Sequence, residues 1–172
     1  MTSRAVRLVS PVAAIIFSTA VGAAALAEES NPAALAAAMQ SATATLQAGL
    51  RASEAQGTPI SAKFEIEDGK LQLSVYTMKG DDFMEVVADP KTGAIAKAEK
   101  ITDADDLNEA TEQKAAMARA KVPLLTATDK ALGANVGSRA VSIFPELKNG
   151  QATAEVTLLT GNAFKKVTEK LD

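Results

Sequence analysis

The fold of this 172-residue chain is decided by the stretch Ile60-Ser-Ala-Lys-Phe-Glu-Ile-Glu-Asp-Gly-Lys-Leu-Gln-Leu-Ser-Val-Tyr76. Apolar side chains occupy every second position from Ile60 to Ile66 and again from Leu71 onward, which is the period of a strand with one buried face. Asp68-Gly69 separates the two runs and is a hairpin turn signal, because glycine adopts positive φ without a steric penalty. The stretch therefore predicts two antiparallel strands.

The segments downstream extend this hairpin into a meander. Gly80-Asp81 predicts a second turn, and residues 89–93 predict a third. Strands are expected at 83–88 and 94–101, on either side of the third turn.

Helices are expected before and after the meander. Asn31-Pro32 begins the first, whose apolar residues continue at helical spacing to Leu50. Gly49 and the polar stretch before it leave two shorter helices open. A connecting helix at 103–121 and a short helix at 124–134 follow the meander.

From Gly137 the pattern of glycines and apolar residues repeats. Gly57 and Phe64 match Gly137 and Phe144 at an offset of 80, and one inserted residue then shifts the offset to 81. Five further residues match at that offset: Gly69, Val75, Gly80, Phe83 and Val86 match Gly150, Val156, Gly161, Phe164 and Val167. We interpret the chain as two tandem α+β units, each a helix packed on an antiparallel β-meander. The expected boundaries are 28–101 for the first unit, 102–122 for the linker helix and 123–172 for the second unit.

Residues 1–27 have the pattern of a secretory signal peptide. Arg4 and Arg7 precede a mostly apolar stretch that ends in Ala25-Leu26-Ala27, with small residues at the −3 and −1 positions. Polar residues and a proline interrupt that stretch, which weakens the alternative of an uncleaved membrane anchor. We expect cleavage after Ala27 and a periplasmic or extracellular location, with no stable membrane anchor afterwards.

Composition argues against an enzyme. The chain contains no His, Cys or Trp, which excludes Ser-His and Cys-His nucleophile pairs, thiolate metal sites and disulfides. Beyond the leader there are 16 basic and 21 acidic residues, a balance that disfavours nucleic acid as a partner. The acidic run that starts at Asp103 lacks the glycine and glutamate that a calcium loop needs, since Asn108 and Lys114 occupy those positions. No metal, cofactor or catalytic residue is therefore expected.

The first unit resembles the PepSY domain family. The most specific part of the resemblance is the strand Val86-Val-Ala-Asp89 followed by Thr92-Gly93, preceded by a strand that carries Val75-Tyr76. The second unit is similar but degenerate, because Thr157 replaces the tyrosine and the Asp-x-x-Thr-Gly motif is absent. The resemblance implies a non-catalytic extracytoplasmic module that binds or restrains proteases. It also implies a tandem layout similar to the fold of β-lactamase inhibitory protein.

The expected partner-binding surface is the polar face of the first two strands. Its candidate residues are Lys63, Glu65, Gln72, Tyr76 and Met78. An exposed aromatic side chain on a sheet is a typical anchor for a protein partner. The sequence leaves open whether Tyr76 anchors a partner or is partly covered by the linker helix or the other unit. The expected function is an exported binding protein, with an envelope peptidase as the partner to be inhibited or regulated. The alternative is a structural or self-associating periplasmic protein without a protease target, and the sequence does not give the oligomeric state.

Overall fold

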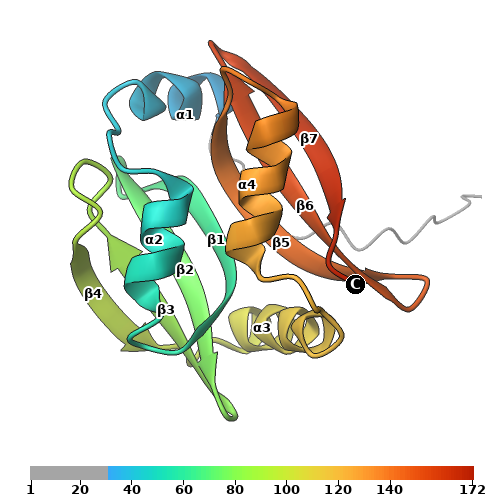
Figure 1. Ribbon diagram of the computed structural model, residues 1–172. Helices are drawn as coiled ribbons and strands as arrows, with labels where there is room; N and C mark the ends of the chain where they lie inside the picture. Colours follow the sequence, from blue (N-terminus) through green and yellow to red (C-terminus); the bar gives the residue numbers. More distant parts are fainter. Residues whose placement is uncertain (1–30) are drawn as a thin grey trace, which may run out of the picture.

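The computed structural model describes residues 31–172, so the predicted leader with its cleavage site after Ala27 lies outside the described residues. The helices are α1 (Pro32–Met39), α2 (Leu46–Ser53), α3 (Ala104–Met117) and α4 (Leu124–Ala134). The strands are β1 (Thr58–Glu67), β2 (Lys70–Lys79), β3 (Asp82–Ala88), β4 (Ile95–Lys100), β5 (Arg139–Lys148), β6 (Gln151–Thr160) and β7 (Ala163–Lys170). Four helices and an antiparallel sheet of seven strands in this part of the chain confirm the α+β class (Figure 1).

The seven strands form one sheet in the order β4-β3-β2-β1-β5-β6-β7. Within β1–β4 and within β5–β7, strands that are consecutive in the sequence pair antiparallel through turns, as the turn signals predict. The two hairpin turns at Asp68-Gly69 and Asn149-Gly150 both hold two residues at positive φ. The meanders join where β1 pairs antiparallel with β5, through only two residue pairs, Ala62 with Ile143 and Lys63 with Ser142.

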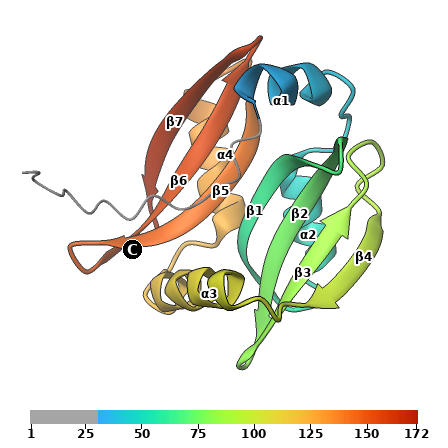
Figure 2. The same cartoon turned by 180° about the vertical axis from the view of Figure 1, so that it is seen from behind.

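The helices divide between the two faces of the sheet. α2 and α4 lie side by side on one face (Figure 1), and Gln47 of α2 donates a hydrogen bond of 3.1 Å to Asp129 of α4. Together with α1 they bury the main core against alternate residues of the strands. α3 packs near one end of the strands against the opposite face, and Figure 2 shows the sheet from that side.

Ile60 lies in a different cluster from the one that the strict alternation predicts. Ala62 and Phe64 pack in the main core, whereas Ile60 packs with Phe83 and Ala110 beneath α3. The cause is a β-bulge, because the register between β1 and β2 shifts between Pro59 and Ser61. An extra residue in one strand breaks the alternation, so that side chains on either side of the bulge no longer face the sides that a regular strand would give them.

The N-terminal helical region is two helices, which was one of the two alternatives. Asn31 caps α1, and its side chain accepts a hydrogen bond of 3.0 Å from the backbone of Ala33. Thr45 caps α2 in the same way through the backbone of Ala48. The connection between the helices rests on the turn after β3, where the carbonyl of Pro90 accepts from the backbone of Thr43 and Ala44 at 3.1 and 3.0 Å.

Asp89, Thr92 and Gly93 form that turn. The carboxylate of Asp89 accepts hydrogen bonds from the backbone of Lys91 and Thr92 and from the Thr92 hydroxyl, at 3.0, 2.7 and 2.9 Å. The hydrogen bonds from Thr92 hold the pKa of Asp89 below its ordinary value. Gly93 follows at a φ of +73°. The Asp-x-x-Thr-Gly motif is therefore a structural turn that positions the α1–α2 connection.

Gly49 has a packing role beyond its effect on helix propensity. A Cβ at this position of α2 would lie 2.5 Å from Cδ2 of Leu73, a residue that is completely buried in β2. The missing side chain thus lets α2 approach the sheet closely. Gly133 in α4 has no such packing role, because a Cβ there would meet nothing within 4 Å.

We predict opposite effects for the same substitution at these two glycines. Gly49→Ala forces Leu73 to move within a packed core and lowers the free energy of unfolding by about 1–3 kcal/mol. Gly133→Ala gains helix propensity and raises it by roughly 0.5–1 kcal/mol. Urea unfolding of the two variants checks the prediction, and a stabilised Gly49→Ala variant would contradict the close approach.

Candidate functional site

The five candidate residues from the sequence lie on one face of the sheet, the face that α3 partly covers. Lys63 and Glu65 come from β1, and the other three come from β2. The register places Gln72 opposite Glu65 and Tyr76 opposite Ser61, so their side chains project to the same side. Four of the candidates, Lys63, Glu65, Gln72 and Tyr76, lie close together. Met78 lies nearer the end of β2.

Tyr76 and Met78 are partly covered by α3. Both pack against the cluster that contains Phe83, together with Leu107 of α3. Burial raises the pKa of Tyr76 far above its ordinary range, and the charge of Glu85 adds to the effect. Of the two alternatives for Tyr76, cover by the linker helix is the one observed. The tyrosine is a half-buried wall of the site rather than a free anchor.

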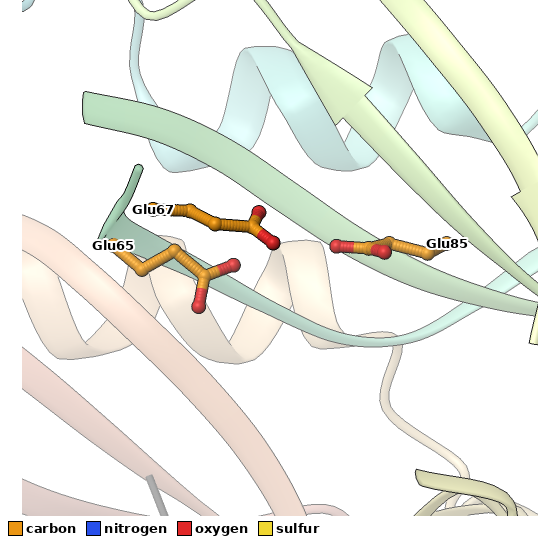
Figure 3. A group of neighbouring side chains, drawn as sticks. All are labelled: Glu65, Glu67 and Glu85. Atoms are coloured by element: carbon orange, nitrogen blue, oxygen red, sulfur yellow. The ribbon is translucent and has the colours of Figure 1, made fainter. Parts of the chain in front are cut away.

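Three carboxylates form an acidic patch beside these residues. Glu65 and Glu67 of β1 and Glu85 of β3 offer oxygen atoms that all lie within 4.8 Å of one another (Figure 3). The sequence analysis did not single out Glu67 and Glu85. Both could have been found, because Glu67 continues the alternation of β1, and the turn between β2 and β3 fixes Glu85 opposite Tyr76.

Two side chains supply hydrogen-bond donors to the patch. The amide of Gln72 donates to Glu67 and lies 3.4 Å from Glu65 and 3.1 Å from the hydroxyl of Ser74. The ammonium of Lys63 pairs with Glu65 at 2.6 Å and lies 5.7 Å from the centre of the Tyr76 ring. Lys63 thus carries a positive charge next to an aromatic face and a carboxylate.

The patch carries more negative than positive charge. Burial raises the pKa of Glu85 above its ordinary value; Glu65 and Glu67 add to this, while a hydrogen bond to Ser74 and the charge of Lys63 oppose it. Burial also raises the pKa of Glu109 on α3, again with Lys63 opposing. The local field therefore favours a cationic group.

The patch has the carboxylate oxygens of a site for a hard cation, but two of its three carboxylates already bind other side chains. Carboxylate oxygens suit cations such as Ca²⁺, and the patch carboxylates could each offer one. The oxygens of Glu65 and Glu67, however, already accept from the ammonium of Lys63 and the amide of Gln72. The geometry fits recognition of a cationic side chain better than it fits a metal.

A cleft of about 740 Å³ lies where α2, α3 and α4 approach the start of β1. Leu50, Met117 and Leu124 contribute to its apolar lining, and Lys114 stands at its edge. That lysine is already bonded to Asp81 at 2.7 Å and to the Gly80 carbonyl at 2.9 Å. The cleft offers apolar surface and no converging reactive groups among the described residues.

The structure is that of an α+β protein whose candidate site offers charged and hydrogen-bonding side chains. Residues 33–99 match the model of the PepSY family, described as "Peptidase propeptide and YPEB domain". The match includes α2, the first meander and all residues of the acidic patch. It confirms the resemblance of the first unit.

Comparison with other proteins adds little to this assignment. No curated protein matches the sequence. Among solved structures, the chain is similar to a putative lipoprotein from Clostridium difficile 630 at 14% identity and a TM-score of 0.37, covering 66% of this chain and 75% of that one. A likeness at that level carries no argument about function.

We predict that Glu85→Gln stabilises the protein at neutral pH. The raised pKa means that folding opposes ionisation of Glu85, so its contribution to stability grows as the pH falls through that pKa. Replacing the carboxylate should raise the free energy of unfolding by on the order of 0.5–1 kcal/mol at about pH 7, and this gain should vanish below about pH 4. Thermal unfolding against pH measures this.

Glu112→Gln, at an exposed position on α3, is the matched control for Glu85→Gln. Surface substitutions of this kind usually change stability by less than about 0.5 kcal/mol. Equal gains in the two variants, or a gain at position 85 that is independent of pH, would rule out the raised pKa that we assign to Glu85.

Proposed function

We propose that this is an exported, non-catalytic PepSY-type protein that binds another protein of the cell envelope through the acidic patch and its surroundings. The observation that carries the proposal is the patch itself, where the carboxylates of Glu65, Glu67 and Glu85 lie close together and Lys63 pairs with Glu65. A basic side chain of a partner would relieve their mutual repulsion. The patch lies within the segment that matches a family of peptidase propeptides.

A peptidase is the partner that the family supports best. PepSY is a domain of the propeptide type and is generally non-catalytic, and the absence of His and Cys from the chain agrees with a binding role. Docking of this kind needs complementary charge and shape on a folded surface, and it needs no reacting group. Inhibition or regulation of the bound peptidase is the activity that we propose.

Export is part of the proposal and depends on the leader at 1–27. PepSY domains occur in extracytoplasmic proteins, and this agrees with the charge and cleavage pattern of the leader. None of the helices that the structure describes is long and apolar enough to cross a membrane.

The tandem layout is the second part of the proposal. The bulge at Ile60 in β1 and the register shift between Ala140 and Ser142 in β5 support it, because both lie at the same distance before their hairpin turns. With the bulges and the turns aligned, each residue of β1 corresponds to the residue of β5 that lies 81 positions later. The predicted match of Phe64 with Phe144 was therefore wrong: Phe64 faces the main core, and Phe144 points to the opposite face beside Ile143.

Affinity capture with a charge-reversal pair tests the proposed surface. Residues 28–172 serve as bait in envelope extract, and the bound proteins are identified by mass spectrometry. Glu67→Lys changes an exposed patch residue, and Glu54→Lys makes the same change on the far side, at the end of α2. We expect a peptidase to bind the wild type and the Glu54→Lys variant, with at least about tenfold weaker binding to Glu67→Lys.

Three outcomes would contradict the proposal. Capture of no peptidase, with no slowing of proteolysis by the purified protein, would remove the partner. Equal binding of the two variants would leave a partner but would move its contact away from the patch. Binding that is insensitive to salt would also argue against a charged contact, because exposed charges are screened beyond about 10 Å at 0.1 M salt.

A further inference from the structure

β7 is an edge of the sheet in the part of the chain that the structure describes, because it pairs with β6 alone. An edge strand presents a row of backbone N–H and C=O groups that another strand can pair with. Its sequence is Ala163-Phe-Lys-Lys-Val-Thr-Glu-Lys170. Charged side chains on an edge oppose pairing with another strand unless residues of opposite charge face each other.

The side chains on the α4 side of β7 are already held in place. Lys165 donates a hydrogen bond of 2.8 Å to Asn135, and Glu169 pairs at 2.8 Å with Lys130 of α4. Val167 lies between them and is half-buried against the main core. Because α4 supports this strand from one side, the edge is an ordered surface.

The charges of β7 select one register for pairing with a second copy of itself. A symmetric antiparallel pair must be centred on one residue, since only then do opposed side chains point to the same face. If the pair is centred on Lys165 or Lys166, that lysine faces its own copy. If it is centred on Thr168, Lys166 faces Lys170 of the other copy. If it is centred on Glu169, the two glutamates face each other.

Centring on Val167 avoids every clash of like charge. In this register Lys165 of each copy lies opposite Glu169 of the other, so opposite charges face each other twice by symmetry, next to the contacts that these two residues make with Asn135 and Lys130 of their own copy. Val167 meets Val167, and Phe164 lies opposite Lys170. Cross-strand pairs of opposite charge or of apolar residues each contribute roughly 0.2–1 kcal/mol.

We propose that the protein self-associates by antiparallel pairing of β7 with β7 of a second copy, centred on Val167. The contact is small, so it forms a reversible dimer rather than a permanent one. It extends the sheet across two molecules and leaves the acidic patch, which lies in the other meander, free. The inference stands independently of the proposed function.

The other edge is a weaker candidate for the same contact. β4 has only six residues and is exposed over almost its whole length. Lys97 and Glu99 of β4 already pair with each other on one strand, 2.7 Å apart. Charge reversal on β4 therefore serves as the matched control.

Sedimentation velocity over a concentration series tests the proposal with two single variants. Lys165→Glu places like charges opposite each other in a homodimer, and so does Glu169→Lys. We expect the wild type and the control Lys97→Glu to dimerise and each β7 variant alone to dissociate at least about tenfold more readily. Mixing the two β7 variants should restore the dimer, because each reversed charge then faces the other. Circular dichroism confirms that the variants are folded.

The mixing experiment separates pairing from general effects on the fold. A wild type that stays monomeric up to its solubility limit would overturn the proposal. Dimers that Lys97→Glu abolishes, or variants that fail to recover on mixing, would also overturn it, because the contact would then lie elsewhere. Binding of a peptidase is measured separately, so loss of self-association and loss of partner binding are distinguishable.

Discussion

The structure depends on the antiparallel pairing of β1 with β5. Two residue pairs, Ala62 with Ile143 and Lys63 with Ser142, join the meanders into a single sheet. Without this contact each meander would have an exposed central edge, and α2 and α4 would lose their packing against each other. With it, α2 and α4 lie side by side over one continuous core, and the opposite face becomes a shared surface. The acidic patch begins at Lys63, directly beside this pairing.

α3 secures the same contact from the other face. Gln113 accepts a hydrogen bond of 2.7 Å from the buried hydroxyl of Ser61, beside the residues where β1 meets β5. Lys114 and Arg119 bind the turns of the two meanders, at Gly80 and at Gly150. A buried polar pair of this kind is costly to separate, because each partner would be left unsatisfied. The helix that connects the meanders in sequence thus also connects them in space, and it covers Tyr76 while leaving Glu67 exposed.

Much of the fold could be predicted because its signals are local. Strand alternation, turn glycines and the Asn31 cap each act within a few residues, and each predicted element is present. The bulge at Ile60 could not be predicted, since it depends on how β1 pairs with its neighbour. The pairing of β1 with β5 was beyond local signals for the same reason. For the site, alternation brought four of the candidates together, but Glu85 required the register of a third strand, and the cover over Tyr76 required the path of α3.

A disulfide across the junction tests the single sheet most directly. The chain has no cysteine, so Lys63→Cys with Ser142→Cys introduces one defined pair at directly opposed positions. Opposed residues of neighbouring strands have Cα atoms about 4.5–5.5 Å apart, within the range of a disulfide. Thr157 lies one strand further away, opposite Ser142, so Lys63→Cys with Thr157→Cys is the control. The account predicts rapid, complete cross-linking of the first pair under mild oxidation and none of the second. Failure of the first pair to close in a folded protein would contradict it.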